Sequence, residues 1–317
     1  MHNGAAEASI PGYLQPWFLR ANAAQAGAVL PEVFAALKKT VASRADLLAA
    51  GMTSRGLTSA VRRRRLIRIR RDHYALPGTS RHILEAVRIG GRLACQSALA
   101  HAGVFAVDED FTHAHLDRDA SRTRHPRDRW RRLTAGERDG VHVHWGALLD
   151  PAGEDSVSIV DALAQTLRCV HPWHALAAID NALHLRLISM RDVSRIFAAA
   201  PKRLRYLQAH VDGLAEAGQE TVLRMIVASL GLRYEVQVTL PGVGRVDLIV
   251  EGWLVLEADS KEAHEGWEQQ VRDSDRGLAA ARLGYATLRP VYQRTMFSPD
   301  AVALAILGAL RGRRRRA

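Results

Sequence analysis

The stretch GRVDLIVEGWLVLEADSK, residues 244–261, decides the fold of the C-terminal part because it sets charged side chains into two otherwise apolar segments. Asp247 stands within the first segment, and Glu257, Asp259 and Lys261 occupy every second position at the end of the other. Successive side chains of a strand point to opposite faces, so the last three would share one face. A strand end reaching solvent would explain them, and so would a metal site.

The carboxylates of Asp247, Glu257 and Asp259 would converge if the two segments pair as neighbouring strands. Carboxylates without a counter-charge repel one another, so such a cluster usually holds a divalent cation. Mg²⁺ suits it, with Mn²⁺ as the alternative, because Mg²⁺ takes one or two carboxylates and completes its shell with water and phosphate oxygens. The ion would activate a water molecule that Lys261 orients, and it would stabilise charge on a phosphate.

The neighbouring segments predict a mixed sheet with helices on its faces. Apolar periodicity favours a helix over 218–232, with Glu220 in its first turn, and strands over 234–240, 244–250 and 252–261. Further patterns predict a helix over 265–284, a strand over 285–292 and a closing helix over 299–311.

These elements resemble the PD-(D/E)XK nuclease superfamily, and within it the small Vsr-like endonuclease domains, over about residues 215–310. The resemblance implies a restriction-endonuclease-like α/β domain in which Asp247 and Glu257 are the primary metal ligands. Asp259 is the further ligand, and Glu220 and Lys261 complete the catalytic set. The residues that match supporting positions of the family signature are His264, Asp273, Arg276 and Arg289.

The match departs from the family at several positions. Val246 stands where the family has proline, and Ser260 where it usually has glycine. The acid-x-lysine triplet can be read as Asp259 to Lys261 or, with Asp259 in place of lysine, as Glu257 to Asp259. The alternatives to a working site are a nuclease fold without chemistry, used for dimerisation or DNA binding, and a plain surface strand.

Residues 31–80 predict a winged helix-turn-helix. Ser43 and either Thr53 or Ser54 are N-cap candidates for short helices, and a basic hairpin turns at Asp72 and His73. The third helix and the hairpin would meet DNA, and a solvated basic face is the alternative. The arginines expected to contact it are Arg55, Arg62, Arg63, Arg64, Arg65, Arg68, Arg70 and Arg71.

The charge of the chain points to a polyanionic partner. The formal charge is +11, yet residues 31–80 hold 11 lysines and arginines against 3 acids, while residues 211–310 hold 9 against 14. We expect double-stranded DNA as the partner, with RNA left open and a second copy of the chain or a cognate toxin as further candidates. Two cysteines and no apolar leader or span predict a cytoplasmic protein without a membrane partner.

The segments ADLLAAGMTSRGLTSAVRRRRLIRIRRDHYALPG, ACQSALAHAGV, HVHW and VSIVDALAQTL resemble AbiEi-type antitoxins and transcriptional regulators over about residues 31–200. That resemblance implies a winged-helix head followed by an α/β domain that acts in repression. The expected fold is α+β and multidomain: a loose arm (1–30), the winged helix (31–80), a mixed α/β middle domain (81–205), the nuclease-like domain (211–310) and a basic tail (311–317).

Two histidine pairs lie on predicted strands of the middle domain. His113 and His115 would share one strand face, as would His142 and His144. The alternatives are polar strand faces and a zinc site, and the first is favoured because no cysteine or carboxylate near them in sequence completes a ligand set. The preferred function is a DNA-binding, metal-dependent endonuclease or nickase in defence, mobile-element biology or repair; the alternative is a repressor or antitoxin without cleavage.

Overall fold

The computed structural model describes residues 30–107, 110–134, 140–258 and 267–314, which belong to two compact units. The first unit comprises the described parts of Met1–Arg92 and Asp119–Asp139, and the second those of Leu93–Arg118 and Gly140–Ala317. The predicted middle domain is therefore divided between the units. No described helix is long and apolar enough to cross a membrane.

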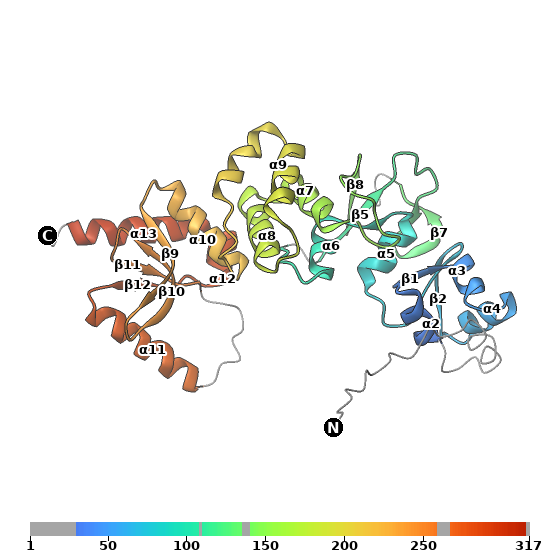
Figure 1. The fold of residues 1–317 in the computed structure, drawn as a ribbon, viewed down its shortest axis with the longest axis horizontal. Helices are drawn as coiled ribbons and strands as arrows, with labels where there is room; N and C mark the ends of the chain where they lie inside the picture. Colours follow the sequence, from blue (N-terminus) through green and yellow to red (C-terminus); the bar gives the residue numbers. More distant parts are fainter. Residues whose placement is uncertain (1–29, 108–109, 135–139, 259–266, 315–317) are drawn as a thin grey trace, which may run out of the picture. The chain divides into compact units, whose positions relative to one another are not determined.

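The first unit begins with short helices and strands that alternate. They are α2 (Leu30–Leu37), β1 (Val41–Ser43), α3 (Arg44–Ala49), α4 (Ser54–Arg62), β2 (Ile67–Arg70) and β3 (His73–Ala75), shown in blue in Figure 1. Ser43 and Asp46 form a capping box on α3, and Thr53 accepts a hydrogen bond from the N–H of Gly56 at the start of α4. The N-caps expected at Ser43 and Thr53 are confirmed.

A three-stranded antiparallel sheet, in the order β1-β3-β2, covers the core of this unit. Helix α5 (Arg81–Ile89) follows, and a hairpin of β6 (Arg124–His125) and β7 (Asp128–Arg132) belongs to the same unit. The guanidinium of Arg129 donates to the carbonyl of Arg68 over 2.9 Å, which joins this hairpin to β2. The arginine-dense segment 118–132 thus contains two short strands.

The second unit contains a small sheet and a group of helices. The sheet runs β4 (Arg92–Leu93), β5 (Thr112–Leu116) and β8 (Val141–Trp145), with β5 and β8 parallel. The helices are α6 (Cys95–His101), α7 (Ile159–Cys169), α8 (Pro172–His184), α9 (Met190–Ala199) and the 3₁₀ segment Lys202–His210.

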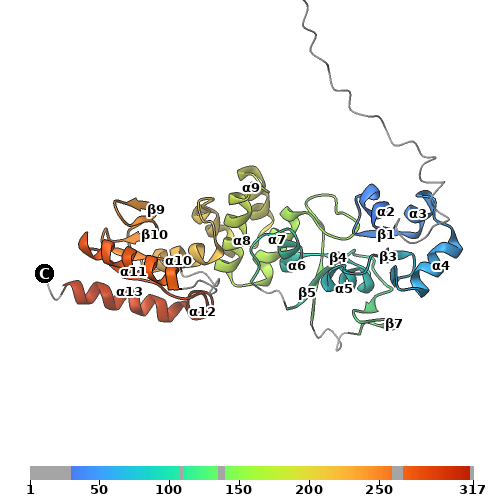
Figure 2. The same ribbon diagram turned by 90° about the horizontal axis from the view of Figure 1, so that it is seen from below.

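The C-terminal sheet of this unit has the order β12-β11-β10-β9, and its strands are β9 (Tyr234–Leu240), β10 (Gly244–Val250), β11 (Leu254–Leu256) and β12 (Ala286–Leu288). Only β11 and β12 are parallel among these pairs. One face packs on α10 (Gly218–Ser229), α12 (Tyr292–Phe297) and α13 (Pro299–Arg314), and the other on α11 (Trp267–Arg282), as Figures 1 and 2 show. The expected mixed sheet with helices on its faces is confirmed.

Strand β11 is shorter than the sequence predicts. The alternating pattern predicts a strand to Lys261, but β11 ends at Leu256, the last residue paired with β12. The N–H of Ala258 then donates to a carboxylate oxygen of Asp247 instead of to a strand backbone. Glu257 consequently lies just beyond the strand end.

Candidate active site

The first turn of α10 fixes Glu220. Gly218 begins the helix where a side chain would come within 2.5 Å of the Phe105 ring, so the glycine allows this close approach. The Glu220 carboxylate turns back and accepts hydrogen bonds from the N–H groups of Glu216, at 3.2 Å, and Ala217, at 3.1 Å. This is the N-terminal position at which a helix favours a carboxylate.

An irregularity in β9 brings Gln237 to the same place. Gln237 has φ of +52°, an uncommon conformation for a residue other than glycine, and it is skipped in the pairing of β9 with β10. Its amide nitrogen donates to Glu220 over 2.8 Å. Its amide oxygen is buried and accepts no hydrogen bond from any residue that the structure describes. Sequence reasoning missed Gln237, because nothing in an alternating strand pattern marks it.

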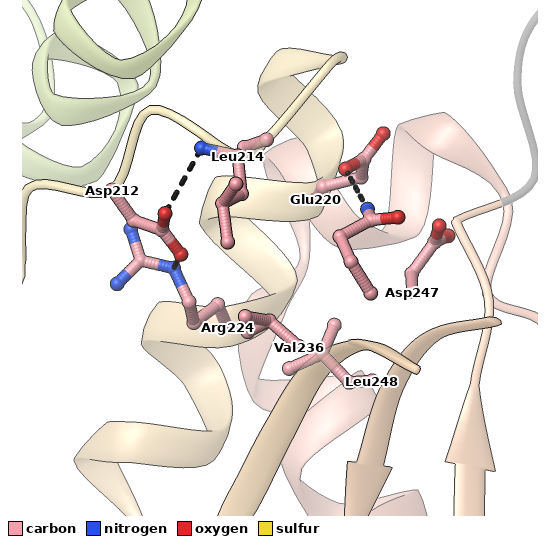
Figure 3. Close-up of a pocket in the computed structure, with 9 residues that line it drawn as sticks. Asp212, Leu214, Glu220, Arg224, Val236, Asp247 and Leu248 are labelled. Atoms are coloured by element: carbon pink, nitrogen blue, oxygen red, sulfur yellow. Dashed lines mark hydrogen bonds and ion pairs between the residues drawn. The ribbon is translucent and has the colours of Figure 1, made fainter. Parts of the chain in front are cut away.

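Asp247 faces Glu220 from the sheet. It stands on β10, and both residues line a pocket between α10 and the middle of β9 and β10 (Figure 3). In the close-up, Glu220 and Asp247 lie at one end of the pocket, and Asp212 and Arg224 at the other. The complete lining consists of Asp212, Leu214, Ala215, Glu220, Arg224, Val236, Gln237, Asp247 and Leu248.

The two carboxyl groups disfavour each other's ionisation. Burial, and next the charge of Asp247, raise the pKa of Glu220 to about 7. Burial also raises the pKa of Asp247, against the hydrogen bond from Ala258, and the charge of Glu257 adds to the rise. Glu220 therefore changes its protonation state near neutral pH. A cation bound beside these groups would displace the proton of Glu220.

Glu257 is held by arginines. One carboxylate oxygen lies 2.6 Å from Nη2 of Arg276, and the other 2.6 Å from Nε of Arg289. Arg276 also donates to the carbonyl of Arg245, and Arg289 lies 3.8 Å from Asp273. The supporting residues Asp273, Arg276 and Arg289 thus gather around Glu257, while Glu220 and Asp247 share the pocket.

The predicted ligand set is only partly assembled by the described residues. Within them, Glu220, Asp247 and Glu257 do not form a group of three oxygen donors close enough to share one ion. Asp259, Lys261 and His264 lie outside the described ranges. Among the described residues, the set consists of two adjacent carboxylates, Glu220 and Asp247, and a third, Glu257, that is paired with arginine.

The chemistry of the pocket fits Mg²⁺ or Mn²⁺. Glu220, Asp247 and the buried amide oxygen of Gln237, which has no partner among the described residues, offer oxygen donors alone, the ligand type that these hard cations prefer. Buried polar oxygens without partners are rare, and an ion or an ordered water is a usual explanation. The fit concerns donor type and electrostatics.

The predicted nucleic-acid face lies on α4 and the β2-β3 hairpin. Seven of its eight arginines are exposed. The exception is Arg70, which is half-buried; burial, and next the nearby Arg124, lower its pKa. The β6-β7 hairpin adds basic side chains that were not assigned to this face, because a dense run of arginines in sequence does not say where it folds. They are Arg129, Arg131 and Arg132, beside the exposed Trp130.

Comparison with known proteins finds no protein-family model and no curated protein that matches the chain. The two resemblances therefore depend on the residues and element order given above, and the geometry of the site carries the functional argument.

Proposed function

We propose that the protein binds DNA and cleaves phosphodiester bonds with a divalent cation held at the pocket of Glu220 and Asp247. One observation carries the proposal. Two half-buried carboxyl groups, one with its pKa raised to about 7, adjoin a buried amide oxygen that has no partner among the described residues. This costly arrangement would be relieved by a cation. Carboxyl groups with strongly raised pKa values cluster at functional sites.

The order of elements in the first unit supports DNA delivery. Helices α3 and α4 followed by the β2-β3 hairpin match the order of a winged helix-turn-helix, and exposed arginines lie on α4 and the hairpin. Such a face supplies phosphate affinity that does not depend on base sequence. In the proposal, this unit holds the duplex and the C-terminal sheet carries the reaction.

The proposed reaction uses the acidic residues and Lys261 in different roles. Asp247 and Glu220 would hold the ion, which would lower the pKa of a water molecule and offset negative charge on the phosphate. Lys261 and Asp259 keep the catalytic parts that the nuclease resemblance implies. Glu257 joins the ligand set when Arg276 and Arg289 release it, since both arginines are also suited to bind the negatively charged DNA backbone.

A second candidate has an observation of its own. Both oxygens of Glu257 are neutralised by arginine, as they would be in a nuclease fold that has lost its chemistry. The protein would then be a repressor or antitoxin that binds DNA without cutting it.

Cleavage of supercoiled plasmid separates the two candidates. The purified full-length protein is incubated with plasmid in Mg²⁺ or Mn²⁺, and nicked and linear forms are followed over time. The proposal expects cleavage that requires the cation and falls at least a hundredfold in Asp247→Asn and Glu257→Gln, because loss of such an electrostatic group typically costs about 10²–10³ in rate. DNA affinity should stay unchanged in both variants.

Glu251→Gln is the matched control, since Glu251 is a carboxylate of the same sheet that pairs with Arg233 away from the pocket. It should cleave like the wild type. Equal cleavage by all variants would expose a contaminating nuclease. Absence of cleavage with every cation, together with intact DNA binding, would favour the repressor.

A further inference from the structure

A cluster of two cysteines and two histidines lies in the second unit, apart from the pocket of Glu220 and Asp247, which we call the carboxylate pocket. It consists of Cys95, His113, His144 and Cys169, whose donor atoms all lie within 4.8 Å of one another. Within the described residues, it is the one group of three or more potential ligands that could hold a metal ion. None of the functions proposed above uses it.

Two of the donor separations are close to those around a tetrahedral ion. Nδ1 of His113 lies 3.2 Å from Nε2 of His144 and 3.7 Å from the sulfur of Cys169. Zinc–nitrogen bonds of about 2.0 Å and zinc–sulfur bonds of about 2.3 Å place the donors of a tetrahedral site about 3.3–3.8 Å apart. The two measured separations fall at or next to this range.

Four separate elements supply the ligands. Cys95 begins α6, His113 is on β5, His144 is on β8 and Cys169 ends α7. Cys95 and His113 are fully buried, whereas His144 and Cys169 are half-buried. An ion would therefore tie two helices to two parallel strands and still be reachable from solvent.

Neighbouring side chains hold Cys95, one of the two buried ligands, in place. Cys95 has φ of +47°, a strained conformation for a residue with a side chain that recurs at functional sites. Its N–H donates to the side-chain oxygen of Gln165 over 3.1 Å, and its sulfur lies 3.4 Å from the hydroxyl of Thr166. Groups of this kind orient metal ligands from the second layer.

We infer that Cys95, His113, His144 and Cys169 form a structural Zn²⁺ site. Two thiolates and two imidazoles are the ligand set that Zn²⁺ takes in closed, four-coordinate structural sites, and hard cations such as Mg²⁺ avoid it. With all four positions filled by protein, the ion has no open position for substrate. Its role is to fix α6 and α7 against the β5-β8 pair, independently of the carboxylate pocket.

Metal analysis of the untagged full-length protein, purified under reducing conditions, tests the site. We expect one zinc ion per chain by mass spectrometry of the metal content. After removal by chelation, Co²⁺ should restore occupancy with the intense visible bands of a tetrahedral site and a near-ultraviolet thiolate-to-cobalt band. The thiolate band is specific to a site with cysteine ligands, so a cation at the carboxylates cannot imitate it.

Variants locate the ion. Cys169→Ser and His144→Ala should lower zinc affinity about tenfold or more, since even second-layer changes typically cost about 10–100-fold. His101→Ala, an exposed histidine at the end of α6, and Asp247→Asn should keep the metal. Absence of both zinc and the thiolate band in the wild type would overturn the inference, a result that needs no folded variant. Zinc affinity of Cys169→Ser equal to that of the wild type would also overturn it.

Discussion

At the residue scale, the central feature is a carboxyl group whose ionisation the fold opposes. Glu220 is anchored by N–H groups of its own helix start and by Gln237, yet burial and Asp247 raise its pKa to about 7. A capping carboxylate alone would have a lowered pKa, because N–H donors and the helix N-terminus favour the charged form. The pKa of Glu220 is therefore raised by burial in the pocket and by Asp247, which outweigh the effect of the helix start.

The stability of the protein should depend on pH through Glu220. The folded state binds the proton more tightly than the unfolded state, so stability falls as the pH rises from about 4.5 to above 7. The loss should be up to about 3 kcal/mol, at 1.36 kcal/mol for each pKa unit. Glu220→Gln should flatten this decline in urea unfolding measured between pH 5 and 8. An equally steep decline in the variant would show that Glu220 is not the group responsible.

The sequence predicts some residues of the two candidate sites and not others. Glu220 and Asp247 were found because each is an acid in an otherwise apolar element. Gln237 was not found, since its position depends on a local irregularity in β9 that the alternating pattern hides. The sequence does not predict that Cys95 and Cys169 share a site with the histidines. The four residues spread over positions 95 to 169 and lack the short ligand spacing of a zinc-finger motif.

At the element scale, the β2-β3 hairpin combines a short turn with exposed arginines. Its turn residue Asp72 has φ of +61°, and Arg68 on β2 and Arg71 in the turn are both exposed. The sequence predicted this hairpin well because alternation and turn chemistry are local. It did not predict that the β6-β7 hairpin joins β2 through Arg129, since that hydrogen bond links residues 61 positions apart.

Removal of Arg68 and Arg71 should weaken DNA binding. The double change to alanine should lower affinity for duplexes of any sequence and reduce the slope of log K against log salt by roughly 0.9 for each phosphate that the variant no longer neutralises. Fluorescence anisotropy at several salt concentrations measures both quantities. Arg203→Ala is the control, an exposed arginine of the second unit. A slope equal to that of the wild type would remove the hairpin from the interface.

At the scale of the whole molecule, a buried ion pair joins the helical part of the second unit to its C-terminal sheet. Asp180 on α8 lies 2.8 Å from Arg224 on α10 and also accepts from Thr221 and Asp212. Burial nevertheless raises the pKa of Asp180 to about 7. The sequence predicts a domain boundary between these helices, because long-range pairs leave no periodic signal. The structure instead places both helices in one compact unit.

Arg224→Met should destabilise the second unit strongly and in a pH-dependent way. Removal of one partner from a buried pair costs about 3–5 kcal/mol, since the other charge is left uncompensated. The loss should be larger at pH 8 than at pH 5, because Asp180 can take up a proton in acid. Urea unfolding of the wild type and the variant at the two pH values measures this difference in the free energy of unfolding. Arg233→Met, which breaks an exposed pair with Glu251, should cost about 1 kcal/mol or less.

The most direct test of the central claim is the binding of Mn²⁺ to the carboxylate pocket, measured by the electron paramagnetic resonance signal of the free ion. The wild-type protein should remove Mn²⁺ from the free pool with saturation, more tightly at pH 8 than at pH 6 because the proton on Glu220 competes with the ion. Asp247→Asn should abolish this uptake, and Cys169→Ser should leave it intact. Identical titration curves for the wild type and Asp247→Asn would contradict the account.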